Sequence, residues 1–252
     1  MYQFFELENR IFLGDCLDRL SFFPAKCIDC IACDLPYQVT QNEWDSLINL
    51  EQLWIEYKRI IKDNGVIVLT ATQPFASQLI SSNPKMFKYD LIWVKNKSSG
   101  HLNAKRMPLR QHESILVFYN KPPTYNPQKS TGHEPVHAYT KHVDSSNYGA
   151  TQYGFSGGGS TERHPTSVLQ FKVLNNDAPE RFHPTQKPVE LFEWIIQTYT
   201  NEGDLVLDSC IGSGTTCVAA IRCGRKFVGI EKDDEYYQKA YSRIKTVQSI
   251  YA

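Results

Sequence analysis

The sequence predicts an α/β fold whose mostly parallel, doubly wound sheet is built by both ends of the chain. Short apolar runs typical of buried strands occur at five places: 10–13, 28–33, 66–69, 205–207 and 227–230. Helices are predicted at 16–22, 50–62, 74–80, 188–200 and 215–223, with a last one beginning near residue 234. Strands that alternate with helices indicate parallel pairing. Two more strands are expected at 89–94 and 114–119, and Asn64-Gly65 is read as a helix stop.

The middle of the chain, residues 121–182, shows neither a strand nor a helix pattern. It contains Pro122-Pro123, Gly157-Gly158-Gly159 and many Ser, Thr, Asn and His residues. A run of this length without regular structure is usually functional or disordered. We therefore expect an inserted region at 121–182, partly disordered, between two halves of one domain, 1–120 and 183–252.

Composition excludes some classes of protein. The 252 residues carry 27 basic and 27 acidic side chains, so a nucleic-acid surface would have to be a local patch. No apolar run approaches the roughly 20 residues that span a bilayer, and the N-terminus lacks the pattern of a signal peptide. We expect a cytoplasmic protein without a membrane partner.

A local excess of about six positive charges lies between residues 95 and 141, where the acids are Glu113 and Glu134. The basic residues are Lys95, Lys97, Lys105, Arg106, Arg110, Lys121, Lys129 and Lys141. Phosphate contact is one use of such a patch, and a solvated basic loop is the other interpretation.

Three of the seven cysteines, Cys27, Cys30 and Cys33, are spaced three apart, which is compatible with metal ligands. They fall on a predicted strand, however, where residues three apart point to opposite faces. Buried thiols are the favoured interpretation, and no metal is predicted.

An apolar strand runs into a glycine turn and a helix at Leu205-Val206-Leu207-Asp208, Gly212 and Gly214. Glycines let the chain turn sharply and let a ligand approach the backbone. Glu231 ends the next strand, where a carboxylate accepts hydrogen bonds from ribose hydroxyls. The third glycine of the dinucleotide fingerprint is missing, which favours a nucleoside cofactor without a pyrophosphate. A tight turn without a ligand and a solvated Glu231 are the alternatives.

Asp34-Leu35-Pro36-Tyr37 follows the strand 28–33 directly. Pro36 favours an extended Leu35, whose carbonyl can then point outward. A carboxylate, a carbonyl and a ring are what an amino group on a flat base needs: two acceptors and a stacking surface. The alternative is a strand-end turn in which Asp34 caps a helix and Tyr37 packs.

In this order the motifs resemble those of the β-class DNA amino-methyltransferases. The resemblance covers roughly 1–120 and 180–245. It is carried by Asp34-Leu35-Pro36-Tyr37 with Trp44-Asp45, by His183-Pro184-Thr185-Gln186-Lys187-Pro188, by the stretch from Asp208 to Thr216, by Gly14-Asp15 and by the stretch from Gly224 to Glu231. The chain departs from the family pattern in two places: Leu35 replaces a proline, and Ser209-Cys210 replaces Pro-Phe.

The resemblance implies a Rossmann-like S-adenosylmethionine-dependent methyltransferase fold with an inserted target-recognition region. It implies base flipping of double-stranded DNA, with catalysis by Asp34, Leu35, Pro36 and Tyr37. The expected cofactor residues are Asp15 (adenine), Glu231 (ribose), Gly212, Gly214 and Thr215 (methionine part), Thr185 and Lys187 (carboxylate), with Asp34 and Asp208. Lys187 could instead be a surface lysine. Lys97, Lys105, Arg106 and Arg110 are expected to contact DNA, and Tyr125, Tyr139, Tyr148, Tyr153 and Phe155 to belong to the target-recognition region.

The expected reaction is methylation of N6 of adenine in duplex DNA. N4 of cytosine is the nearest alternative, followed by a non-catalytic nucleoside- or DNA-binding module and by methylation of RNA or protein on the same fold. The recognition sequence, a homodimer and a restriction-modification partner stay open.

Overall fold

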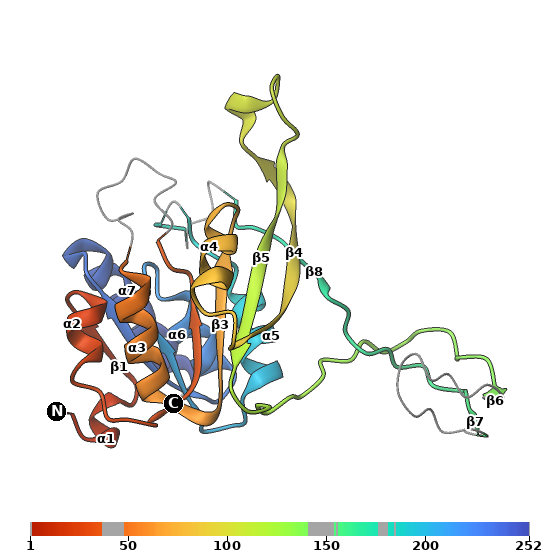
Figure 1. Ribbon diagram of the computed structural model, residues 1–252, viewed down its shortest axis with the longest axis horizontal. Coiled ribbons are helices and arrows are strands. Elements are labelled where there is room, and N and C mark those ends of the chain that lie inside the picture. Colours follow the sequence, from red (N-terminus) through yellow and green to blue (C-terminus); the bar gives the residue numbers. More distant parts are fainter. Residues whose placement is uncertain are drawn as a thin grey trace. The chain divides into compact units, whose positions relative to one another are not determined.

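The computed structural model describes residues 2–36, 48–140, 154, 156–175, 181–183 and 185–251. Its centre is an eight-stranded sheet (Figure 1). In spatial order the strands are β1 (Arg10–Leu13), β10 (Lys226–Glu231), β9 (Leu205–Asp208), β2 (Ile28–Cys33), β3 (Ile61–Ala71), β5 (Arg110–Tyr119), β4 (Phe87–Ser99) and β8 (Val168–Phe171). All neighbours pair in parallel except β5, which is antiparallel to β3 and to β4.

β2 and β9 are neighbours although they are far apart in the chain, with Cys30 opposite Val206 and Ile31 opposite Leu207. The chain runs outward from β2 to β3 in one direction and from β9 to β10 in the other. Ligands of open α/β sheets bind at such a switch point, outside the carboxyl ends of the strands.

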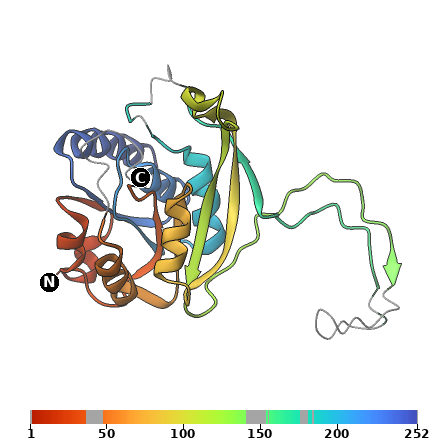
Figure 2. The same ribbon diagram turned by 45° about the horizontal axis from the view of Figure 1, so that its top comes forward.

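Helices cover both faces of the sheet (Figures 1 and 2). One face packs against α1 (Phe4–Leu7), α2 (Cys16–Leu20), α3 (Leu50–Ile60) and α4 (Phe75–Ser82). The other packs against α5 (Val189–Tyr199), α6 (Thr215–Arg222) and α7 (Asp234–Tyr251). Along β2, Ile31 and Cys33 face the first layer, while Cys30 and Ala32 face the second. This alternation explains why the strand reads as a continuous apolar run.

The cysteines follow the same alternation. Cys27 and Cys33 lie in the first core layer and Cys30 in the second. All seven are free thiols, and six are buried, as predicted. Burial raises the pKa of the Cys27 and Cys33 thiols to about 11. Within the described ranges, no three Cys, His, Asp or Glu side chains are grouped as metal ligands.

Two sequence-based expectations about element boundaries are wrong. The helix α3 ends at Ile60, because Ile61 is already extended and pairs with Ile28 in the sheet. Gly65 therefore lies inside β3, where a Cβ would approach the Asp29 carbonyl oxygen to 2.9 Å. Residues 168–171, expected to be irregular, form β8 and extend the sheet beside β4.

The chain divides into two compact units, Met1–Asn126 with Ser167–Ala252, and Pro127–Thr166. The smaller unit lies within the predicted insertion. It contains β6 (Tyr139–Thr140) paired with β7 (Ser156–Gly157), and Ser130 bridges Arg163. No helix in the described part of the chain has the length and apolar character needed to cross a bilayer.

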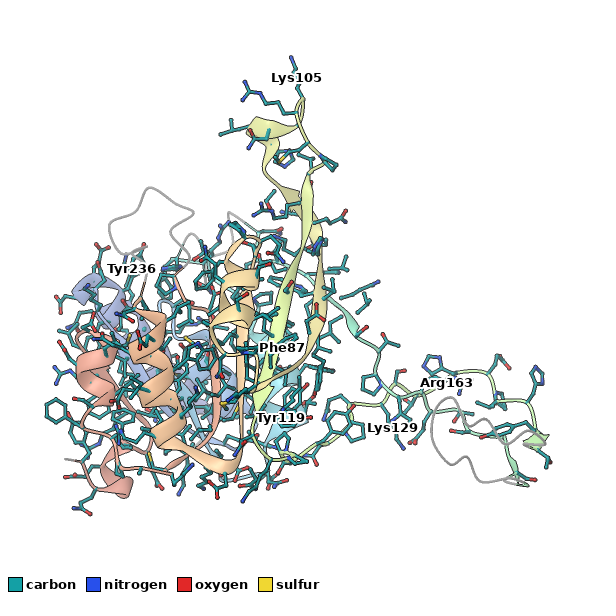
Figure 3. All side chains as sticks on the ribbon, in the orientation of Figure 1. Phe87, Lys105, Tyr119, Lys129, Arg163 and Tyr236 are labelled. Atoms are coloured by element: carbon teal, nitrogen blue, oxygen red, sulfur yellow. The ribbon has the colours of Figure 1, made fainter. Side chains whose placement is uncertain are left out.

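β4 and β5 form a long hairpin, and Figures 1 and 3 show it extending beyond the sheet, with Lys105 at its outer end and Phe87 and Tyr119 at its inner end. The turn includes a short 3₁₀ helix, η1 (His101–Asn103). β8 pairs with β4 only as far as Lys95, so the outer part of the hairpin is paired within itself.

Candidate active site

A cavity of about 1030 Å³ lies at the carboxyl ends of the neighbouring strands β1, β10, β9 and β2. Most of the predicted site residues line it: Asp15, Asp34, Leu35, Pro36, Thr185, Lys187, Asp208, Gly212, Thr215 and Glu231. Parallel strands bring the residues that follow them to one edge of the sheet, which is why segments so distant in sequence meet here. Tyr37 and Pro184 lie outside the described residues.

The glycine turn after β9 depends on backbone conformations that favour glycine. Gly212 has φ +47° and Gly214 has φ +74°. A Cβ at Gly214 would approach Ile244 of α7 to 3.1 Å, so the absence of a side chain here lets the start of α6 pack closely against α7. Gly214 does not line the cavity. At Gly212 the nearest atom to a Cβ would be Nε2 of His183, at 3.4 Å.

Asp208 holds this turn together. Its Oδ1 accepts from the Cys210 backbone N–H at 3.0 Å and its Oδ2 from the Thr216 hydroxyl at 2.5 Å. Burial raises the pKa of Asp208 to about 6. Thr215 precedes Thr216 at the start of α6. Its hydroxyl lies within hydrogen-bond distance of the Ser213 hydroxyl and of the Lys187 backbone carbonyl.

Of the two residues after Asp208 that depart from the family pattern, Ser209 has a structural explanation. Its hydroxyl lies 2.6 Å from the Tyr57 hydroxyl and 3.5 Å from the Cys33 sulfur. Tyr57 is fully buried and its hydroxyl needs a partner. The Ser209 hydroxyl provides that partner.

Glu231 ends β10 and is 9% exposed, so the interpretation of a solvated strand-end residue is wrong. Its Oε2 accepts from the Gly212 N–H at 2.8 Å, and its Oε1 from the N–H groups of Lys232 and Asp233 at 2.9 Å. Burial raises the pKa of Glu231, although these three donors act in the opposite direction.

Asp15 follows β1 and caps α2, accepting from the Leu17 N–H at 2.9 Å. Its other oxygen lies 3.7 Å from the Lys232 ammonium. The side chain is 41% exposed and lines the cavity, so a ligand can reach it.

Asp34 follows β2 and accepts hydrogen bonds from two side chains, the Thr70 hydroxyl at the end of β3 and the Lys187 ammonium at 2.7 Å. Leu35 is buried and Pro36 is half-buried. Lys187 is only 8% exposed, so the alternative of a surface lysine is wrong.

Four charges, of which the two lysines are buried and the two carboxylates partly buried, form a chain at the cavity wall: Lys95, Glu113, Lys187 and Asp34. Glu113 Oε1 lies 3.1 Å from the Lys95 ammonium, and its Oε2 lies 3.3 Å from that of Lys187, an ion pair outside hydrogen-bond geometry. Burial acts to raise the pKa of Glu113, but Lys187 and Lys95 outweigh it and the pKa is lowered. The two positive and two negative charges balance.

Sequence reasoning missed Glu113 and Thr70 as site residues and placed Lys95 in the surface patch. Lys95 is 8% exposed and paired with Glu113, so it is not available to phosphates. The available signal was position: Lys95 directly follows the predicted strand 89–94, and Glu113 directly precedes 114–119. Adjacent strands brought these opposite charges together.

His183 connects the glycine turn to α7. Burial, and then the nearby Lys187 charge, lower the pKa of His183 to about 4, so the ring is neutral at pH 7. Its ring packs against Tyr236 with centroids 4.4 Å apart, and its Nδ1 lies 3.2 Å from the hydroxyl of Thr185, which is an exposed residue.

The predicted DNA-contacting residues all lie on the β4–β5 hairpin. Lys97 and Arg110 line the cavity, while Lys105 and Arg106 are exposed in the turn. Two other lysines of the predicted basic patch form ion pairs with carboxylates: Lys121 pairs with Asp63, and Lys129 pairs with Glu162. Tyr125 and Tyr139 are exposed, and Lys141, Tyr148, Tyr153 and Phe155 lie outside the described residues.

Comparison with known sequences gives one family and several relatives. Residues 28–242 match the model of the N6_N4_Mtase family, described as DNA methylase. The chain is 30% identical to the DNA adenine methyltransferase YhdJ of Escherichia coli K12, over 92% of this chain and 81% of YhdJ. It is 28% identical to the type II methyltransferase M.BglII of Bacillus subtilis, over 92% and 68%, and 29% identical to M1.MboII of Moraxella bovis, over 92% and 95%.

Solved structures share the fold. The M1.HpyAVI–SAM complex superposes with a TM-score of 0.64 at 24% identity, covering 93% of this chain and 98% of that one. The cytosine-N4-specific PvuII DNA methyltransferase gives 0.67 at 17% identity, covering 97% and 91%. Together with the observed sheet, these similarities confirm the predicted fold class.

Proposed function

Because the chain belongs to the N6/N4 DNA methylase family, we propose that it methylates N6 of adenine at a specific sequence in duplex DNA, with S-adenosylmethionine as the methyl donor. One observation carries the proposal. Asp34 after β2 and the glycine turn after β9 open side by side into one cavity, at the switch point of the sheet. A nucleoside cofactor and a base can therefore meet there.

The residues fit the cofactor. The Glu231 carboxylate has about four acceptor sites, and backbone N–H groups use three, which leaves one for a ribose hydroxyl. Asp15, beside it and partly exposed, is available to the adenine amino group. The positive φ of Gly212 keeps the turn free of a side chain where the methionine part would lie, near Thr185. When bound, S-adenosylmethionine supplies an electrophilic methyl group.

On the substrate side, Asp34 and the Leu35 carbonyl accept hydrogen bonds from the amino group of the base, and Tyr37 stacks on its ring. Lys187 and Thr70 restrain the Asp34 carboxylate, which limits the rotamers it can adopt. The amino nitrogen would gain the methyl group as the bond from that group to the cofactor sulfur breaks, which leaves S-adenosylhomocysteine, and it would lose one proton, which the Asp34 carboxylate can accept. Catalysis is then largely positioning of the nitrogen on the line of transfer.

The base must leave the duplex to enter this cavity. Lys97 and Arg110 at the cavity wall, with Lys105 and Arg106 in the hairpin turn, supply charge for the phosphates. For adenine, the support is Asp at the first motif position and the adenine specificity in the name of YhdJ. N4 of cytosine is the second candidate, because the PvuII enzyme of the same fold is cytosine-N4-specific.

The test is incubation of the purified protein with unmethylated genomic DNA and S-adenosylmethionine, digestion to nucleosides and mass spectrometry. N6-methyladenine is expected with the wild type and is absent with Asp34→Ala, which removes the side-chain oxygens that accept hydrogen bonds. The control Asp90→Ala, at an exposed carboxylate on β4, should retain full activity. N4-methylcytosine would reverse the base assignment, and the absence of any methylated base would refute the proposal.

Cofactor binding is tested separately by calorimetry with S-adenosylhomocysteine. Glu231→Gln should bind it more weakly, because an amide nitrogen cannot accept the hydrogen bonds that one carboxylate oxygen now receives. Unchanged affinity would remove Glu231 from the proposed ribose site.

A further inference from the structure

The hairpin tip, residues 100–109, carries apolar side chains that the rest of the described chain does not cover. Leu102 in η1 is fully exposed, Met107 is 56% exposed and Leu109 is 37% exposed. Single exposed apolar residues are common on protein surfaces. Three within eight residues, at the outer end of a projecting hairpin, indicate a contact surface (Figure 3).

The charge around these side chains identifies the partner as a polyanion. Residues 96–112 contain Lys97, Lys105, Arg106 and Arg110 and no Asp or Glu. A second protein surface would be expected to meet a mixed or apolar patch, whereas a row of cations without acids complements phosphates. The apolar tip and the cations thus belong to one nucleic-acid contact.

The tip also adjoins the cavity that receives the base. Residues 98–101 and Arg110 line the same cavity as Asp34, and Leu102 is the next residue after this wall. With the target base in this cavity, a side chain at this position would lie close to the nucleotide that enters it.

We propose that Leu102 inserts into the base stack of the duplex at the space left by the target base. The inference rests on the proposed function and deepens it by naming the residue that compensates for unstacking. Leucine and methionine are side chains that proteins use as apolar wedges between base steps. Lys105 and Arg106, beside it in the turn, hold the phosphates on either side.

A wedge has a specific kinetic signature. Unstacking and unpairing cost less when the target base is mismatched, so an aid to base extrusion matters less on a mismatched duplex. A phosphate contact or a structural role would matter equally on both. The comparison between matched and mismatched duplexes therefore separates the two roles.

The experiment first maps the methylated sequence in genomic DNA treated with the wild type. Single-turnover methylation is then measured on a duplex with that site and on one in which the target base faces a non-complementary base. Leu102→Ala should slow the matched duplex about tenfold and the mismatched one much less, since a buried leucine side chain is replaced by a methyl group. Leu102→Met should restore most of the rate. The control Ile250→Ala, at a 70% exposed residue near the end of α7, should behave as wild type.

Equal slowing of methylation on the two duplexes, or no slowing on the matched one, would refute the role of Leu102 as a wedge. Methylation by the wild type would still support the proposed function in that case. A change in oligomeric state of Leu102→Ala, measured by light scattering, would assign the tip to a contact between copies and also overturn the wedge. Failure of the wild type to methylate any DNA would instead refute the proposed function, and the wedge with it.

Discussion

Replacing Lys187 with Met should destabilise the protein by about 3 kcal/mol at pH 7. The ammonium lies 2.7 Å from Asp34 and 3.3 Å from Glu113. At an effective dielectric constant of about 20, each contact represents about 5–6 kcal/mol of gross attraction. Desolvation of the buried charges offsets much of this, and breaking a buried pair costs about 3–5 kcal/mol. We expect the lower end, because the Asp34 side chain is 21% exposed.

The assay is urea unfolding followed by circular dichroism, in which this loss lowers the midpoint by about 1 M. Lys58→Met, at an exposed lysine on α3, is the matched control and should change stability by less than about 0.5 kcal/mol. The double variant Lys187→Met with Glu113→Gln loses the attraction between Lys187 and Glu113 once, whereas the sum of the two single effects counts that attraction twice. It should therefore be more stable than the sum of the single effects predicts. Additive effects, or a loss below about 1 kcal/mol for Lys187→Met, would refute the assignment of these residues to one charge chain.

Three further predictions follow from the site and the core. The pKa of His183 is lowered from 6.5 to about 4, so the stability contributed by the neutral ring is present above pH 6.5 and is lost as the pH falls from 6.5 towards 4. His183→Gln should therefore flatten the dependence of the unfolding free energy on pH in that window, and an unchanged slope would contradict this prediction. Gly212→Ala should lower the free energy of unfolding by about 1–2 kcal/mol and weaken the binding of S-adenosylhomocysteine. The control Gly203→Ala, also at positive φ but with open space around it, should lower stability alone, and equal affinities in the two variants would contradict the role of Gly212. The six buried thiols are shielded from a disulfide reagent, and burial also raises the pKa of Cys27 and Cys33 to about 11, so these six should react at pH 8 only after unfolding. Rapid reaction of more than one thiol in the native protein would disprove this.

The edge of the site could be predicted from the sequence because strands buried on both faces leave continuous apolar runs. Whatever follows such a strand must lie at the carboxyl edge of the sheet. Asp34, Glu231 and the turn at Gly212 were located in this way, and all line one cavity. The ends of the elements were less predictable. Asn64-Gly65 has the composition of a helix stop, yet Gly65 is required by its close approach to the neighbouring strand.

β8 could not be recognised in advance, because Val168–Phe171 buries only Leu169 and its strand conformation comes from pairing with β4. The hairpin turn presents the same difficulty. Its four cations were visible in the sequence, but the full exposure of Leu102 and the nearness of residues 98–101 to the cavity were not.

By itself the sequence determined which residues follow the buried strands and therefore lie at the carboxyl edge of the sheet. Local apolar runs, glycines and the chain order of the motifs were sufficient for this. Only the tertiary structure decided which charges are buried together. Lys95 and Glu113 lie on β4 and β5, Lys187 precedes α5, and Asp34 follows β2. Whether a lysine is a surface cation or a buried partner depends on the distance to its carboxylates, and that distance exists only once the four segments have packed.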